Sequence, residues 1–252
     1  MNIIFLGTAG SGKTSLCNAY GTWLKKERKE KVSFVNLDPG AVEYLPYSPD
    51  FNIQKFFTIP GIMKNEKLGP NGAIIRANEL ILERANIIIQ EINRLNSEFI
   101  LIDTPGQLET FIFKDAGRLL QQLQKKSPTV AIFLIDAKLT YCASNLIVGL
   151  LLAIAVQIQL GINMIYILHK ADLIPDDLKL IKMIQNPQYL RERIISEHRG
   201  AFTDLALIAH DVVAKLAASI RIITTSAIEP VSGIDQLHDL LHESFCACGD
   251  LT

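Results

Sequence analysis

The feature that most restricts what this chain can fold into is the stretch from Gly7 to Thr14, where glycine, four free residues and a second glycine precede Lys13 and a threonine. A short apolar run at residues 2–6 comes before it and predicts a buried strand. Apolar residues at helical spacing follow it to about Arg28. A strand, a glycine turn and a helix start form the context in which this pattern surrounds a phosphate group. The alternative is a glycine-rich turn that matches by coincidence, and the strand and the Lys13-Thr14 pair argue against it.

Backbone N–H groups supply much of the positive potential in such a loop. Glycines let successive N–H groups turn inward around an anion, and the first N–H groups of the helix add partial positive charge. Lys13 is expected to reach the β- and γ-phosphates, and the Thr14 hydroxyl to take a place on a magnesium ion. The predicted phosphate ligands are Gly10, Ser11, Gly12, Lys13, Thr14 and Ser15.

Length and composition allow one large core. A chain of 252 residues with 49% hydrophobic residues suits a single α/β domain, and the formal net charge of -1 argues against a direct nucleic-acid binder. Basic residues between Lys25 and Lys31 favour a solvated end of the first helix, with a docking patch as the alternative. Met1 leads straight into the predicted strand, so we expect no signal peptide. Four cysteines make no disulfide framework in a chain this long, so we expect a reducing, cytoplasmic location.

The apolar stretch at residues 145–168 is long enough to be tested as a membrane span. Gln157, Gln159, Gly161 and Asn163 interrupt it, and no basic flank closes either end. We therefore expect a buried helix over residues 144–160, a strand over residues 163–168, and no membrane contact.

Two aspartates stand where predicted strands end. Asp38 follows a strand at residues 32–37, beside the crevice where parallel sheets bind ligands. It is a candidate to hold a magnesium-bound water or to orient the attacking one, and a turn aspartate before proline is an equal alternative. Asp103 follows a strand at residues 99–102 and begins an Asp-x-x-Gly pattern that ends at Gly106.

That second pattern is how switch nucleotide hydrolases sense the γ-phosphate. The aspartate acts through magnesium, and the glycine N–H contacts a phosphate oxygen. Gln107 is then expected to orient a water molecule, and Glu109 to position or deprotonate it. The predicted metal ligands are Thr14, Asp38 and Asp103.

Base recognition is predicted at the ends of two later strands. The strand at residues 163–168 leads into His169-Lys170-Ala171-Asp172, where the aspartate can accept both the ring N–H and the exocyclic amine of guanine. The lysine stem is expected to lie along the base. A strand at residues 220–224 leads to Ser226 and Ala227, whose backbone N–H is expected to contact the guanine carbonyl.

Residues 41–97 are expected to form an insertion. Prolines break its first part, which predicts a short helix around residues 52–57, and Gly69-Pro70-Asn71 forms a stiff turn in which Asn71 caps the next helix. That helix, predicted over residues 72–95, is apolar on more than one face, so it requires burial on two sides. Another helix of the chain and a partner subunit are equal alternatives for the second cover.

The last third of the chain is predicted to be mostly helical. We expect helices between residues 174 and 219, with starts at Pro175 and Pro187 and a stop at Gly200, and a final helix over residues 234–245. Cys246 and Cys248 lack the further ligands of a zinc site and are read as structural or incidental. His238 and His242 share a helix face without a glutamate between them and are expected on the surface.

On these residues the chain resembles the GPN-loop GTPase family, and in particular its single-gene members. The resemblance spans the whole chain and rests on Gly69-Pro70-Asn71, on the phosphate loop, on residues 103–107 and on the terminal residues 246–252. It implies a homodimer or a close paralogue dimer in which the asparagine loop of one subunit points toward the phosphates of the other. It also implies a protein client such as RNA polymerase subunits. His169 departs from the asparagine that the family carries.

The expected fold is therefore α/β, a three-layer P-loop NTPase with a mostly parallel central sheet flanked by helices, in one domain over residues 1–252. The expected activity is magnesium-dependent hydrolysis of GTP to GDP, acting as a conformational switch. One alternative is a kinase-type phosphotransferase, whose lid would need Arg191, Arg193 and Arg199. A second alternative is a scaffold that holds nucleotide without turning it over.

Overall fold

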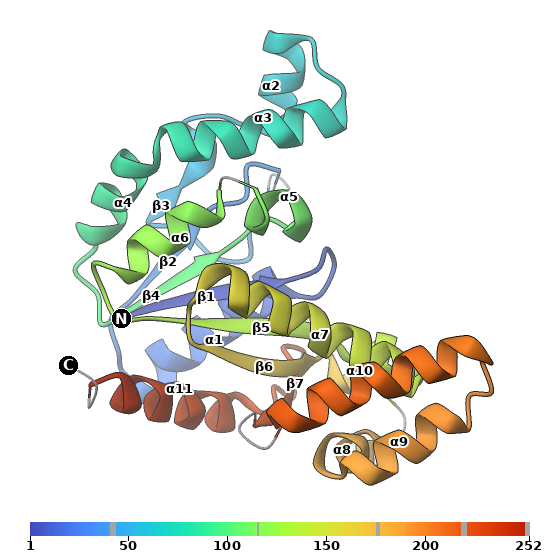
Figure 1. Cartoon of the computed structure of the whole chain (residues 1–252). Helices are drawn as coiled ribbons and strands as arrows, with labels where there is room; N and C mark the ends of the chain where they lie inside the picture. The colour runs from blue at the N-terminus through green and yellow to red at the C-terminus, as the bar shows by residue number, and fades with distance from the viewer. Residues whose placement is uncertain (41–43, 115, 175–176, 218–220, 250–252) are drawn as a thin grey trace.

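Seven parallel strands form the centre of the computed structural model, which describes residues 1–40, 44–114, 116–174, 177–217 and 221–249 (Figure 1). Their order across the sheet is β3-β2-β4-β1-β5-β6-β7, and every pairing between them is parallel. The strands are β1 Asn2–Gly7, β2 Val32–Asn36, β3 Phe51–Asn52, β4 Phe99–Asp103, β5 Thr129–Asp136, β6 Met164–His169 and β7 Ile222–Thr225. The predicted strands, which include an apolar run at residues 129–135 that leads to Asp136, are confirmed in the described residues, and β3 is an addition to them.

The register of the sheet brings the polar ends of the strands to one edge. Asp103 pairs with Phe5 on one side and with Asn36 on the other. Asp136 pairs with His169, which in turn pairs with Thr225. Because parallel strands end on the same side, the residues that follow β1, β2, β4, β5, β6 and β7 all meet at this edge.

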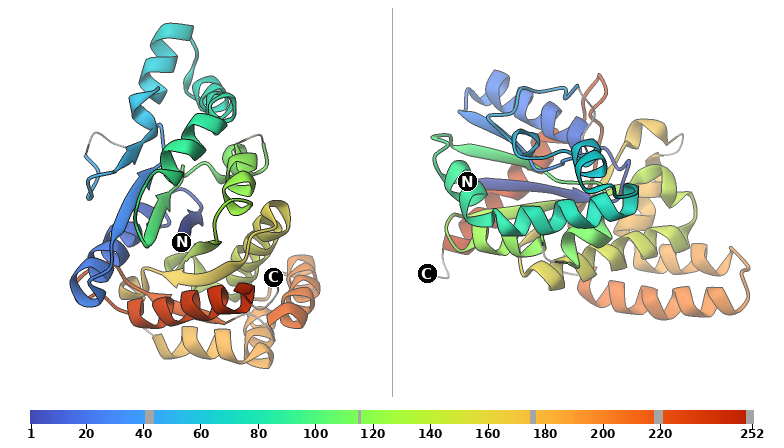
Figure 2. Two further views of the ribbon diagram at one scale, coloured as in Figure 1. Left: turned by 90° about the vertical axis from the view of Figure 1, so that its left-hand side faces the viewer. Right: turned by 90° about the horizontal axis from the view of Figure 1, so that it is seen from above.

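Helices cover both faces of the sheet, as expected for a three-layer α/β fold (Figure 2). One face carries α1 Lys13–Trp23, its continuation at Leu24–Arg28, and α11 Ile234–Gly249. The remaining helices are α2 Ile59–Glu66, α3 Pro70–Glu83, α4 Ala85–Asn93, α5 Leu108–Ile112, α6 Gly117–Gln124, α7 Ala143–Leu160, α8 Asp177–Gln185, α9 Pro187–Ile195 and α10 Ala201–Ala217. Most of these nine helices pack over the opposite face.

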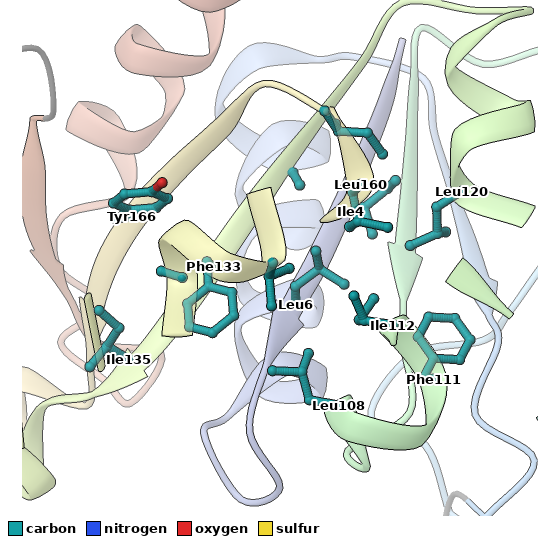
Figure 3. Close-up of a cluster of buried hydrophobic side chains, with 14 of the residues drawn as sticks. Ile4, Leu6, Leu108, Phe111, Ile112, Leu120, Phe133, Ile135, Leu160 and Tyr166 are labelled. Atoms are coloured by element: carbon teal, nitrogen blue, oxygen red, sulfur yellow. The ribbon is translucent and has the colours of Figure 1, made fainter. Parts of the chain in front are cut away.

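The larger core lies between the sheet and that second group of helices. Leu6 of β1, Phe111 of α5 and Phe133 of β5 are all buried in this core (Figure 3). Removing such a side chain from water contributes about 1.5–3 kcal/mol. The core therefore fixes the strand ends, and the loops that leave them, in place.

The predicted helix over residues 72–95 is in fact two helices, α3 and α4. Arg84 lies between them with φ -100° and ψ 9°, and its guanidinium lies over the ring of Phe57. The break lets α4 pack its isoleucines on the sheet while α3 packs on α2 through a small separate cluster. The chain's own α2 thus covers part of the second apolar face of α3.

The start of α3 also corrects the sequence prediction. Gly69 is the N-cap and Pro70 occupies the first turn, so Asn71 is not the cap. Asn71 is exposed within the first turn, where its side chain is available for other contacts.

The short helix predicted around residues 52–57 is present as a 3-10 helix at Ile53–Lys55, which follows the end of β3. Two further expectations need correction. Gly200 precedes α10 rather than stopping a helix, since α9 ends at Ile195. His238 is buried rather than on the surface, and its Nδ1 has a hydrogen-bond partner there, the Tyr20 hydroxyl at 2.9 Å. Pro175, residue 220, the side chains of Cys246 and Cys248, and residues 250–252 lie outside the described residues.

Helix α7 confirms the predicted buried helix. Within the described ranges it is the one helix whose length and apolar composition suffice to cross a membrane. Leu146, Leu150 and Ala153 lie in the larger core, and the helix also packs against α6 and α10. This placement favours a core helix over a membrane span.

Candidate functional site

The loop between β1 and α1 has the backbone that a phosphate-binding loop requires. Gly10 and Gly12 adopt positive φ values of 75° and 96°, which side chains other than glycine rarely adopt. Gly12 is the N-cap of α1, and no side chain in the described part of the structure caps that helix end. The first N–H groups of α1 are therefore free to bind an anion.

Lys13 is folded back over this loop. Its Nζ donates to the carbonyl oxygens of Gly7 and Thr8, each at 3.0 Å, and the residue is 6% exposed. Burial lowers the pKa of the ammonium group, while the carboxylates of Asp103 and Asp38 act in the opposite direction. The cation is thus held at the loop by weak neutral acceptors, which a phosphate oxygen can replace.

Asp103 is the most buried carboxylate at this edge of the sheet. It is 1% exposed, and Oδ2 accepts a hydrogen bond from the Tyr47 hydroxyl at 2.9 Å. Burial raises its pKa to about 6, while the nearby Thr14 hydroxyl, the hydrogen bond from Tyr47 and the charge of Lys13 act in the opposite direction. Its Oδ1 has no partner, and only the Ser11 Oγ shares that property among the buried side-chain atoms described.

Asp38 is held by its backbone and its carboxylate together. Asn36 accepts from its N–H at 3.0 Å and donates to its carbonyl at 3.3 Å, and Asn36 is itself bonded to Asn52 at 3.0 Å. The carboxylate accepts from the Gly40 N–H at 2.8 Å, which is a turn hydrogen bond. Burial raises the pKa of Asp38, and attraction to Lys13 opposes that rise. The two readings of this residue, turn former and site residue, are therefore compatible.

These residues fit a magnesium ion that is shared with a nucleotide. No group of three His, Cys, Asp or Glu side chains capable of holding a metal occurs in the described residues. Magnesium usually keeps several waters and takes one or two carboxylates together with phosphate oxygens. The unpartnered Oδ1 of Asp103, the Thr14 hydroxyl beside it and the nearby Asp38 supply such a donor set.

The loop after β4 touches the phosphate loop. The Thr104 hydroxyl donates to the Phe5 carbonyl at 2.6 Å, and a Cβ on Gly106 would lie 3.2 Å from the Ala9 Cα. Gln107 and Glu109, at the start of α5, are exposed. The backbone of Gly106 is thus adjacent to the loop, while the two polar side chains face solvent.

A cavity of about 240 Å³ lies between this loop and α3. It is lined by Asp38, Gln107, Thr110 and Asn78 together with apolar residues. Asn78 is 6% exposed, and sequence reasoning missed it because a single asparagine within an apolar helix carries no pattern. The exposed residues 69–71 do not line this cavity. A larger cavity of about 570 Å³, between α7, β6 and α11, contains none of the predicted site residues.

The predicted base-binding residues come together at the ends of β6 and β7. Lys170 donates to the Gly10 carbonyl at 2.5 Å and to Asp136 at 2.6 Å. Asp172 is exposed, and its Oδ1 accepts from the Ser226 hydroxyl at 2.6 Å, with Ala227 next in the chain. Asp136 was not predicted as a site residue, although its position at the end of β5 is the signal that marks it.

His169 joins the phosphate loop to the base-binding loops. Its Nδ1 lies 2.9 Å from the Thr225 hydroxyl, and a Cβ on Gly12 would lie 2.6 Å from its ring. Burial, followed by the nearby charge of Lys170, lowers its pKa to about 4. The ring is therefore neutral at pH 7 and acts as a packing and hydrogen-bonding element.

Comparisons with known proteins agree with this geometry. Residues 5–247 match the family described as "Conserved hypothetical ATP binding protein". The chain is 34% identical over 260 residues to the GPN-loop GTPase PAB0955 of Pyrococcus abyssi, with 100% of both chains covered. It is 31% identical to GPN-loop GTPase 3 of Saccharomyces cerevisiae, over 74% of this chain and 70% of that protein. The crystal structure of the Pyrococcus abyssi GTPase in its apo form aligns with a TM-score of 0.86 and 31% identity, covering 98% of each chain.

Proposed function

The chain belongs to the GPN-loop GTPase family, and from this premise we propose that it binds GTP and hydrolyses it with magnesium as a dimeric conformational switch. One observation carries the proposal: a single edge of the sheet holds the phosphate loop, the unpartnered oxygen of Asp103, and Asp172 bonded to Ser226. The proposed metal, phosphate and base ligands follow β4, β1 and β6–β7 across the sheet, and this order supports a nucleoside triphosphate as the ligand.

The phosphate end is the first part of the proposal. Lys13 exchanges its two carbonyl acceptors for oxygens of the β- and γ-phosphates, and the N–H groups of residues 10–15 surround them. A bound magnesium ion would supply positive charge to offset the charge that develops on these phosphates. Thr14, Asp38 and Asp103 are the proposed ligands, directly or through water.

Two of the proposed water-activating groups, Asp38 and Gln107, line the cavity described above. Gln107 and the third group, Glu109, are exposed at the start of α5. Gly106 lies against Ala9, and its N–H is the proposed sensor of that phosphate. We assign the orientation of water to Gln107, with Glu109 and Asp38 as supporting groups.

The base end distinguishes GTP from ATP. The family description names ATP, whereas the two relatives above are named GTPases. Asp172 offers two acceptor oxygens, and the Ser226 hydroxyl fixes the orientation of the carboxylate. Guanine presents two neighbouring donors to such a group and adenine does not, so Asp172 supports GTP.

Assembly is the least direct part of the proposal. Asn71 is exposed and does not line the cavity beside Asp38. Ile75 of α3 and Ile87 of α4 are apolar residues that are also exposed. A second copy of the chain that covers this face would bring residues 69–71 to the neighbouring nucleotide. We also propose one domain over residues 1–252, a cytoplasmic location, and a protein client such as RNA polymerase subunits.

The phosphotransferase alternative loses support from the arginines that it needs. Arg191 is paired with Asp211 at 3.0 Å, and Arg199 with Glu197 at 3.6 Å. Both pairs lie among α9, α10 and the loop between them rather than at the phosphate loop. A lid would require these pairs to break.

Single-turnover phosphate release tests the proposal. The purified protein is mixed with GTP or ATP, with magnesium or with a chelator, and released phosphate is measured. We expect release from GTP that depends on magnesium, and loss of tight GTP binding in Lys13→Ala with the fold intact, because that ammonium balances the phosphate charge. Unchanged GTP affinity of Lys13→Ala in calorimetry would contradict the assignment, and transfer of the γ-phosphate to added nucleosides would favour the kinase alternative.

A further inference from the structure

Tyr47 reaches the phosphate site from a segment that carries no recognisable motif. It lies between β2 and β3, where Tyr44 is 87% exposed but Tyr47 only 7%. Its ring stacks on Phe34 of β2, with centroids 4.7 Å apart and planes 15° from parallel. Asp50 then anchors the same segment, because its backbone and its carboxylate both bond to the backbone of Phe34. The tyrosine is thus fixed on both sides.

The Tyr47 hydroxyl forms a hydrogen bond with only one of the two carboxylate oxygens of Asp103. It donates to Oδ2 of Asp103 at 2.9 Å, and Oδ1 of the same group is buried and unpartnered. The terminal torsion of an aspartate is broad, so a carboxylate that accepts no hydrogen bond on either oxygen has no fixed orientation. Burial of an oxygen without a partner is costly, and such an atom in a site calls for a ligand.

We infer that Tyr47 is a positioning residue for the magnesium–nucleotide complex: its hydroxyl holds Oδ2 of Asp103 so that Oδ1 is presented to the cation beside Thr14. Groups that orient a metal-ligating carboxylate in this way change metal affinity by about 10–100-fold when they are removed. The inference rests on the proposed function, since it needs a magnesium-bound nucleotide at this edge of the sheet.

The alternative is that Tyr47 only packs the segment against β2. The two roles predict different results for Tyr47→Phe, which keeps the ring that stacks on Phe34 and removes only the hydroxyl. A packing residue would lose little by this change. A positioning residue would keep this packing and lose only its hydrogen bond to Asp103.

The experiment measures release of a fluorescent GDP analogue from the full chain at increasing magnesium concentrations and in excess chelator. In Tyr47→Phe we expect the magnesium concentration for half-maximal slowing of release to rise about tenfold or more, with release in chelator unchanged. Tyr166→Phe is the matched control, because Tyr166 is also buried and its hydroxyl bonds to Gln157 of α7 rather than to a proposed site residue. That control should behave as the wild type.

A double-mutant cycle links the effect to Asp103. In an Asp103→Asn background, Tyr47→Phe should not change the magnesium requirement further, because the group through which it acts has been altered. Thermal unfolding of each variant reports whether the fold is kept.

The outcomes separate this inference from the proposed function. An unchanged magnesium requirement in Tyr47→Phe, or equal weakening with and without magnesium, overturns the positioning role while the wild type still responds to magnesium. A wild-type protein whose GDP release ignores magnesium overturns the proposed magnesium site and this inference with it.

Discussion

Replacing Gly12 with alanine tests whether the phosphate loop and His169 fit together as closely as the geometry indicates. At Gly12, φ is +96°, and an added Cβ would lie 2.6 Å from Cδ2 and 2.9 Å from Nε2 of His169. At Gly10, φ is +75°, but an added Cβ meets no atom within 4 Å. The two alanine variants share a backbone cost, and only Gly12→Ala adds a collision with a side chain.

The magnitudes follow from these two terms. Left-handed alanine costs about 1–2 kcal/mol, partly offset by about 0.4–1 kcal/mol from a stiffer unfolded chain, so Gly10→Ala should destabilise by about 1 kcal/mol. In Gly12→Ala the buried ring of His169 must move by roughly 1 Å to restore ordinary contact, which separates it from Thr225. A buried polar group left without its partner adds about 1–3 kcal/mol.

Thermal unfolding of the nucleotide-free variants provides the measurement. An extra loss of about 2 kcal/mol corresponds to a melting temperature about 4–8 °C lower for Gly12→Ala than for Gly10→Ala in a chain of this size. The double variant Gly12→Ala, His169→Ala has room for the new Cβ. Its stability should therefore fall below that of His169→Ala by the backbone cost alone. Equal melting temperatures for the two single variants would refute the close fit.

Four further predictions test the site. Asp172→Asn should weaken GTP relative to xanthosine triphosphate, because the amide offers a donor where the xanthine ring presents an acceptor, and competition binding without a changed preference would place the base elsewhere. Magnesium binding should weaken below about pH 6, because burial raises the pKa of Asp103 to about 6 in the nucleotide-free protein and protons then compete with the cation for this carboxylate; a magnesium affinity that stays constant from pH 8 to pH 5 would contradict this. The same raised pKa means that the folded nucleotide-free protein holds this proton more tightly than the unfolded chain, so stability declines as the pH rises from about 4 to about 6, and Asp103→Asn should remove that slope in urea unfolding. Asn71→Ala should leave folding and GDP affinity near normal but slow hydrolysis about a hundredfold, and mixing it with Lys13→Ala subunits should restore part of the activity if the contact crosses the interface; verified mixed dimers without recovery would exclude that contact.

Local patterns in the sequence were sufficient for the strands and for the loops that leave them. The phosphate loop, Asp103 and Asp172 each follow a buried apolar run directly, so their places at the sheet edge follow from the chain order alone. The parallel arrangement is equally local in origin, because every strand except β2 is followed, in the described residues, by a helix that returns the chain to the opposite edge.

Other parts depended on contacts between distant segments. Arg84 ends α3 because α3 packs on α2 while α4 packs on the sheet. No residue in the 24-residue helix predicted over 72–95 marks that change of packing partner. His238 is buried because Tyr20, 218 residues away, provides a hydrogen-bond partner. Tyr47 acts on Asp103 across 56 residues, from a proline-broken segment without periodicity. These three are tertiary effects, which a single sequence does not encode in any short window.

The break at Arg84 makes α3 a lever arm. Its 14 residues span about 21 Å at 1.5 Å per residue, with the break at one end and Asn71 near the other. A tilt of about 10° at Arg84 therefore carries the Asn71 end through about 4 Å. Asn78, halfway along, moves about half as far and lines the cavity beside Asp38. A tilt of this size would therefore move the cavity wall beside Asp38 by about 2 Å and the Asn71 end by about twice that distance, which is enough to make or break a hydrogen bond.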